Sequence, residues 1–179
     1  MSVSSRILVA TDFSVSAAAA VARAGQLAKE HQAELRLIHA SPDWKLFSRF
    51  LTAQQGHYRT VTQFAESAMQ REVEWLEYKF AIRVSGGVQL GGATRTIARV
   101  AQEFQPQVLV IGARGEHGPS VATSALGGTA LKVLAQTTQP LLLVRDNGTH
   151  PYAEAMAAIG DAGEIARRVV EWGTLLPVP

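Results

Sequence analysis

Short apolar runs alternate along the chain with longer segments in which apolar residues recur every three or four positions. Runs of mainly apolar residues are typical of strands, and they lie at Arg6–Ala10, Glu34–Ile38, Val84–Leu90, Gln107–Ile111 and Leu141–Val144. The third run is interrupted by Gly86 and Gly87. The fourth is apolar from Val108 onward, as expected for a strand covered by helices on both faces. We therefore expect it near the centre of a sheet.

The segments between these runs carry apolar residues at helical spacing. We expect helices from Ser16 to about His31, from Tyr58 to about Phe80, after Gly91–Gly92 as far as Phe104, and from Thr129 to Thr137. In the second of these helices, Glu72 stands among the positions that mark the apolar side. The stretch from Pro42 to about Gly56 shows no clean period, and its structure is left open.

Strand and helix alternate, and the order ends on a strand. Such alternation predicts an α/β fold, an open twisted parallel sheet of five strands with right-handed crossovers and helices on both faces. Ligands in sheets of this kind bind beyond the carboxyl ends of the strands. The segments that follow the strands are therefore the candidate functional segments.

The composition of the 179 residues fits one domain followed by a tail, because 47% of them are hydrophobic and 18% are charged. Lys and Arg are scattered, so we expect no nucleic-acid partner. Cysteine is absent, which excludes disulfides and thiolate metal sites and fits a reducing compartment. The first residues form no apolar signal segment, and no run is long enough to cross a bilayer. We expect a cytoplasmic protein without a membrane partner.

Two glycine-containing segments flank the expected exit of the fourth strand. Gly112-Ala-Arg114-Gly115 follows the strand, and Gly127-Gly128-Thr129 opens the last helix. Main-chain N–H groups can hold phosphate oxygens where no side chain blocks them, and a helix N-terminus adds unpaired N–H groups and a favourable dipole. The Thr129 hydroxyl or the Arg114 guanidinium would add donors, unless Arg114 points into water. The alternative is that the glycines serve only a tight turn and a helix start, since glycine-rich motifs often match by chance.

Three segments of the chain match a known pattern in the right order. They are Ile7-Leu-Val-Ala-Thr-Asp12-Phe-Ser14, Leu37-Ile-His39-Ala40 and the stretch from Val108 to Val144. On these residues the chain resembles the universal stress protein family, and with the spacers the resemblance covers Arg6 to Arg145. It implies a Rossmann-like domain of the adenine nucleotide α-hydrolase-like type over residues 1–145.

The glycines match the family's ATP-binding branch in part. That branch carries Gly-x2-Gly-x9-Gly-Ser/Thr, and Gly112 and Gly115 correspond to its first two glycines. Eleven residues separate Gly115 from Gly127 instead of nine, and Gly128 stands where Ser or Thr is expected. Pairing Gly128 with Thr129 restores the hydroxyl but lengthens the spacer to twelve. We prefer Gly127 as the third glycine, because a leucine then precedes it as in the family.

The resemblance implies that the protein binds ATP, with or without Mg2+, since a branch that does not bind ATP has lost these glycines. Asp12 would then lie near the nucleotide, and the main chain at Ala40 would meet the adenine edge. A competing interpretation is that Asp12 helps to cap the first helix, a role that Ser14 or Ser16 can share. We favour the ligand role, because strand ends are where such sheets place ligands. His39 is expected to end its strand with a satisfied hydrogen bond and not to bind a metal.

No serine-hydrolase elbow, zinc-helix motif or complete P-loop is present. A dedicated enzyme is therefore not expected, and slow hydrolysis of bound ATP is left open. The function that the resemblance implies is an ATP-binding regulatory protein. The alternative is a nucleotide-free dimeric scaffold, in which the longer loop closes over its own pocket and the fold serves partner binding.

Two expectations concern assembly and the tail. Relatives commonly form homodimers through the last strand, Leu141–Val144 here, whose edge would otherwise be exposed. Residues 146–179 resemble the opening of a second copy of the domain. Alternatively they form a C-terminal extension that packs its apolar helix face on the domain or on a partner subunit.

Overall fold

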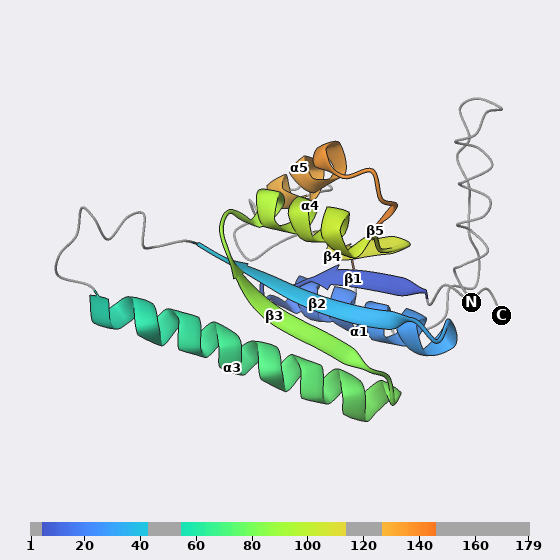
Figure 1. Cartoon of the computed structure of the whole chain (residues 1–179), viewed down its shortest axis with the longest axis horizontal. Coiled ribbons are helices and arrows are strands. Elements are labelled where there is room, and N and C mark those ends of the chain that lie inside the picture. Colours follow the sequence, from blue (N-terminus) through green and yellow to red (C-terminus); the bar gives the residue numbers. More distant parts are fainter. Residues whose placement is uncertain (1–4, 43–54, 114–126, 146–179) are drawn as a thin grey trace. The chain divides into compact units, whose positions relative to one another are not determined.

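A computed structural model of the chain describes residues 5–42, 55–113 and 127–145, and the side chains of all of these except residues 55–60. Five strands form one sheet in which every pairing is parallel. They are β1 (Arg6–Ala10), β2 (Glu34–Ser41), β3 (Val84–Leu90), β4 (Val108–Gly112) and β5 (Leu141–Val144). The predicted class, a five-stranded parallel α/β fold, is confirmed (Figure 1).

Helices cover both faces of the sheet. They are α1 (Val15–Glu30), α3 (Gln55–Phe80), α4 (Ala93–Phe104) and α5 (Gly128–Gln136). Figure 1 shows α1 and α3 on one face and α4 and α5 on the other. Each expected helix is present, with ends that lie within three residues of the expected ones. Within the described ranges, no helix is long and apolar enough to cross a membrane.

The strand order is β3-β2-β1-β4-β5, so β1 is the central strand and β4 lies beside it. The run that was expected near the centre is therefore one strand away from it. β2 continues three residues beyond its expected end, because His39 to Ser41 pair with β3 from Val88 to Leu90. This part of β2 extends past the end of β1, which stops at Ala10.

The side chains of β1 point alternately into two apolar layers. Ile7 and Val9 belong to the layer under α1 and α3, whereas Leu8 belongs to the layer under α4 and α5. β4 alternates in the same way, with Val110 in the first layer and Leu109 in the second. All five side chains are at most 4% exposed. Burial on both faces explains why these runs are almost wholly apolar and do not alternate with polar residues.

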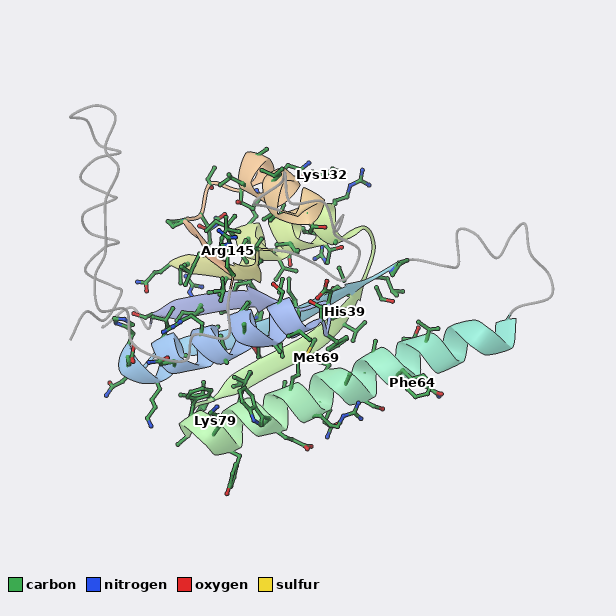
Figure 2. The ribbon with its side chains drawn as sticks, turned by 180° about the vertical axis from the view of Figure 1, so that it is seen from behind. His39, Phe64, Met69, Lys79, Lys132 and Arg145 are labelled. Carbon is green, nitrogen blue, oxygen red and sulfur yellow. The ribbon has the colours of Figure 1, made fainter. Side chains whose placement is uncertain are left out.

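α3 packs one side against the sheet along its second half. Met69 and Leu76, seven residues apart and therefore on one side of the helix, are 4% and 0% exposed. Phe64 is 68% exposed, and Figure 2 shows it on the side of α3 that faces away from Met69 and the sheet. The stretch for which no structure was expected lies mostly outside the described residues, and α3 begins near its end, at Gln55.

The glycine pair of β3 does not interrupt the strand, and its first member is required by α3. A Cβ at Gly86 would lie 2.4 Å from Val73 Cγ2 and 3.0 Å from Met69 Sδ. Val73 is β-branched and has essentially one rotamer in a helix, so it cannot turn away. A Cβ at Gly87 would meet no atom closer than 3.9 Å. Of the two glycines, only Gly86 is needed for the close approach of α3 to β3.

We expect Gly86→Ala to lower the free energy of unfolding by about 1–3 kcal/mol, because the added methyl group overpacks the contact with α3. Gly87→Ala is the matched control in the same strand, and it should be neutral or slightly stabilising because glycine loses more backbone entropy on folding than alanine. Urea unfolding followed by circular dichroism measures both variants. Equal stability of the two would show that α3 does not restrict the strand at Gly86.

Candidate functional site

The space beyond the carboxyl ends of β1 and β4, here called the crevice, lies where the order of the strands reverses. From β1 the chain builds β2 and β3 on one side, and then returns through α4 to β4 on the other side of β1. Open α/β sheets bind ligands at such a reversal. Ala10 pairs with Ile111 at the mouth of this crevice. Its borders are therefore the segments Thr11-Asp12 after β1 and Gly112-Ala113 at the end of β4.

A tight turn from Thr11 to Ser14 leads from β1 into α1. Thr11 Oγ1 accepts a hydrogen bond from Phe13 N at 3.0 Å, and Asp12 Oδ1 accepts one from Ser14 N at 3.1 Å. Ser14 Oγ accepts from Ala17 N at 3.1 Å, which makes Ser14 the N-cap of α1. Asp12 thus supports the turn, while Ser14 caps the helix. The Asp12 side chain is exposed at the border of the crevice.

The turn holds Phe13 in a left-handed backbone conformation, with φ at 62°. A non-glycine residue pays for this conformation with steric strain. β2 supports it from the side, because the ring of His39 stacks on the ring of Phe13 with centroids 4.5 Å apart. His39 Nδ1 lies 2.9 Å from Thr11 O, and since a carbonyl oxygen only accepts, Nδ1 is the donor. His39 thus ends its strand with a satisfied hydrogen bond, as the sequence predicted.

The main chain at Ala40 faces the space beyond the end of β1. Thr11 N donates to Ile38 O at 2.9 Å, so the main-chain groups of Ile38 point toward β1. In a strand the direction of these groups repeats every second residue. The groups of Ala40 therefore point to the same side, where β1 has already ended at Ala10. This is the place that the resemblance gives to the adenine edge.

Gly112 is required by the contact between β4 and the first turn of α1. A Cβ at this position would lie 3.0 Å from both the carbonyl carbon and the carbonyl oxygen of Ser16. These are main-chain atoms and cannot move aside. Beside them, Ser16 Oγ is buried and has no hydrogen-bond partner within the described part of the chain. The glycine therefore has a packing role, and an unsatisfied hydroxyl group lies next to it.

The three residues at the start of α5 differ in what they offer a ligand. Gly127 N donates to Ala113 O at 2.7 Å, so this amide is already used by the fold. Gly128 and Thr129 lie in the first turn of α5, where amides have no acceptor within the helix. Both residues are exposed, and among the described residues a Cβ at Gly128 would meet nothing within 4 Å. Any anion at this helix end would therefore meet the amides of Gly128 and Thr129 and not that of Gly127.

Arg114 and Gly115 lie outside the described residues, as does the loop between them and Gly127. The same holds for the tail, residues 146–179. Across the ranges that the structure does describe, no group of three or more His, Cys, Asp or Glu side chains could hold a metal ion.

Glu72 of α3 carries a buried carboxylate oxygen, Oε2, which has no hydrogen-bond partner within the described part of the chain. Burial raises the pKa of Glu72 above its usual value of 4.5, and the charge of Asp12 raises it further. The signal in the sequence was a carboxylate among the apolar positions of a helix.

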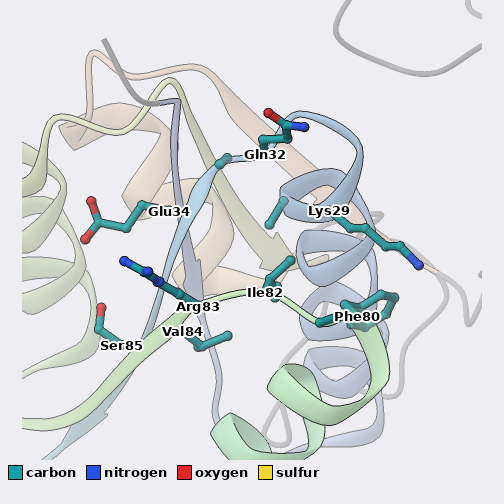
Figure 3. A pocket seen from close by; sticks show the side chains of 11 residues that line it. Lys29, Gln32, Glu34, Phe80, Ile82, Arg83, Val84 and Ser85 are labelled. Carbon is teal, nitrogen blue, oxygen red and sulfur yellow. The ribbon is translucent and has the colours of Figure 1, made fainter. Parts of the chain in front are cut away.

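A hollow lies at the opposite end of the strands, near the amino ends of β2 and β3 (Figure 3). It measures about 660 Å³ and is bordered by the last residues of α1 and α3. Lys29 and Arg83 contribute positive charge to its lining, and Phe80 and Ile82 contribute apolar surface. Sheets of this class place their ligands at the carboxyl edge, so this hollow is not the candidate site.

The doubly wound parallel sheet, with its turn after β1 and its helix N-terminus after β4, defines an α/β protein of the Rossmann-like type. The profile of the universal stress protein family matches residues 4–145, and the chain belongs to this family. No curated protein matches the sequence.

Solved structures of family members share the fold. Universal stress protein UspA from Lactobacillus plantarum is 25% identical over 79% of this chain and 97% of its own, with a TM-score of 0.63. A universal stress protein in complex with cAMP is 22% identical over 79% of this chain and 97% of its own, with a TM-score of 0.58. A universal stress protein from Archaeoglobus fulgidus in complex with dAMP is 15% identical over 79% of this chain and 98% of its own, with a TM-score of 0.54.

Gly112→Ala should lower the free energy of unfolding of the nucleotide-free protein by about 1–3 kcal/mol, because the new methyl group overlaps the main chain of Ser16. Gly128→Ala is the control with open space around its Cβ, and at the first position of a helix alanine is a better helix former than glycine. Thermal unfolding without nucleotide measures both. If Gly112→Ala were as stable as the parent protein, the packing role of Gly112 would be wrong.

Proposed function

We infer that the protein binds an adenine nucleotide at the crevice between β1 and β4, and that ATP, with or without Mg2+, is this nucleotide. The observation that carries the inference is the reversal of strand order, which puts the Asp12 turn on one side of the crevice and the start of α5 on the other. The solved structures with cAMP and with dAMP show adenine nucleotides bound to proteins of the same fold. Their ligands support the choice of an adenine nucleotide here.

Each part of a nucleotide meets a suitable group in this arrangement. The main chain of Ala40, which faces the crevice, would receive the adenine edge. Asp12 carries only acceptors when ionised and suits the donors of a ribose or of the adenine amino group, not a phosphate. The amides of Gly128 and Thr129 suit phosphate oxygens. Ser16 Oγ, which is buried and unsatisfied in the described structure, would gain a partner.

The glycine motif contributes differently from what the resemblance implies. Gly112 allows α1 to approach β4, and Gly127 closes the end of β4 through Ala113 O. In the proposal the phosphates are therefore held by Gly128 and Thr129, together with Arg114 and Gly115 from the loop. This role of the glycines also favours a second candidate function, the nucleotide-free dimeric scaffold, since the fold itself uses two of the motif's glycines.

ATP at about one hundred times its Kd should add about 2.7 kcal/mol to the stability of the native state. For a chain of this size, such a gain raises Tm by roughly 5–10 °C. Asp12→Ala should lose most of the shift, whereas Glu30→Ala, which removes an exposed acid from the far end of α1, should keep it. Differential scanning calorimetry with and without Mg2+ makes the measurement. A parent protein whose Tm ignores ATP under both conditions would favour the scaffold.

The homodimer that we propose forms through the outer edge of β5. Leu109 N donates to Pro140 O, and Ala113 N donates to Val144 O. The main-chain groups of Pro140 and Val144 therefore point toward β4. Those of Leu143 point the opposite way, toward the outer edge of the sheet, because the direction alternates from residue to residue. Leu143→Pro removes the outward N–H and should give a monomer. Leu143→Ala removes most of the same side chain, keeps the N–H and should remain a dimer. Light scattering distinguishes twice the 19.2 kDa chain mass from a single chain, and a monomeric parent protein would rule the interface out.

A further inference from the structure

α3 carries two rows of apolar side chains, and the sheet buries only one of them. Met69 and Leu76 belong to the buried row. The second row, here called the outer stripe, is exposed or half-buried and consists of Val61, Phe64, Ala68, Arg71, Trp75 and Tyr78, all apolar or aromatic except Arg71. At about 3.6 residues per turn, it lies about a third of a turn around the helix from the buried row. Figure 2 shows its member Phe64 on the side of α3 away from Met69.

The spacing of the outer stripe is that of a coiled-coil seam. Its members follow one another at steps of three, four, three, four and three residues, which is the pattern of a helix that packs along a second helix. The steps are the same when they are read from the other end. The stripe can therefore match itself in an antiparallel pair of helices, where a two-fold axis makes every contact occur twice.

The order of side chains along the outer stripe favours the antiparallel pair over the parallel one. An antiparallel pair centred between Ala68 and Arg71 brings Phe64 opposite Trp75 of the second copy, and it brings the long Arg71 opposite the small Ala68. In a parallel pair each position would meet its own copy, so two Arg71 guanidinium groups would face one another. Like charges repel. The antiparallel pair avoids this repulsion and sets aromatic rings against one another, which is a favourable contact.

The charges beside the outer stripe also suit a second copy. Long side chains of a helix lean toward its N-terminus, so the Arg71 side chain extends in the direction of Ala65. In the antiparallel pair, Glu74 of the second copy lies at the level of Ala65 and on the same edge of the stripe as Arg71. Arg71 can therefore pair with that carboxylate, and the symmetry forms the pair twice. The exposed acids Glu66, Glu74 and Glu77 would instead be repelled by an anionic lipid surface.

The exposed area of the outer stripe is enough for a weak but specific contact. Phe64 is 68% exposed, Trp75 39% and Tyr78 91%. An aromatic side chain buries about 150–250 Å² when it is fully covered, so the three rings offer roughly 400 Å² per chain. With Val61 and the apolar stem of Arg71, two stripes cover on the order of 1,000 Å², which is close to the minimum for a specific interface. We therefore expect the contact to form at protein concentrations on the order of 100 µM.

We propose that the outer stripe of α3 binds the outer stripe of a second copy of this chain, as an antiparallel pair of helices. The contact does not depend on nucleotide binding, and it is distinct from the proposed contact through β5. α3 packs on β3, and β3 and β5 are the outer strands at opposite edges of the sheet. One chain can therefore use both contacts at once, and association should continue beyond the β5 dimer at high concentration.

Sedimentation equilibrium from about 5 µM to about 500 µM protein tests the contact. Phe64→Glu places a carboxylate opposite Trp75 of the second copy, where its burial is costly, and should weaken the association at least about tenfold. Gln63→Glu adds the same charge at the neighbouring exposed position, outside the stripe, and should associate like the parent protein. Leu143→Pro should keep the concentration dependence, because it changes only β5. A parent protein of constant mass over this range, or equal association of Phe64→Glu and the parent, would overturn the proposal.

Single cysteines test the direction of the two helices, since the parent chain contains no cysteine. In the antiparallel pair, the two copies of Ala68→Cys are three residues apart along the helix, about 4.5 Å, whereas those of Tyr78→Cys are seventeen residues apart, about 25 Å. A short bifunctional thiol reagent should therefore link Ala68→Cys into a dimer much faster than Tyr78→Cys, although Tyr78 is the more exposed residue. Equal or faster linking of Tyr78→Cys would exclude the antiparallel pair. Linking of neither variant would exclude a second copy as the partner of the stripe.

Discussion

Because helices cover both faces of β1, the strands that pair with it and the connections that follow it are constrained. Ile7 and Val9 on one face and Leu8 on the other must all be buried, and only a parallel sheet with crossover helices on both sides does this for a run so short and apolar. The chain therefore adds β2 and β3 on one side of β1 and then crosses back to add β4 and β5 on its other side. The crevice beside β4 is the result of that reversal, so the place for a ligand follows from the burial of one strand.

Patterns that depend on burial could be predicted from the sequence, and patterns that depend on close approach could not. The strands and helices were found within a few residues, since apolar periodicity reports directly which side of an element is buried. Gly86 and Gly112 looked like interruptions or ligand contacts, yet their space is occupied by Val73 and by the main chain of Ser16. Only the distance between two elements, which no local pattern encodes, distinguishes these roles.

A glycine motif in this family fold has two physical functions that use the same residue type. One is to let a helix approach a strand, as α1 approaches β4 at Gly112, and the other is to expose amides to an anion. The structure separates them by what a Cβ would meet, which is the main chain at Gly112 and open space at Gly128. At Gly112, a match to the motif is therefore evidence that the chain has this fold, and not that it binds a ligand. At the second position no described atom makes such a demand, so the packing of the described elements does not require a glycine there.

The turn after β1 shows how the fold can maintain a strained conformation at the edge of a site. Phe13 has φ at 62°, which costs on the order of 1 kcal/mol for a residue with a side chain. The hydrogen bond to Thr11 and the stacking on His39 together offset this cost. A relaxed turn would have been available if capping α1 were its only purpose, since Ser14 alone caps the helix. The strained residue directly follows Asp12, and His39 of β2 supports the turn through its stacking on Phe13 and its hydrogen bond to Thr11 O.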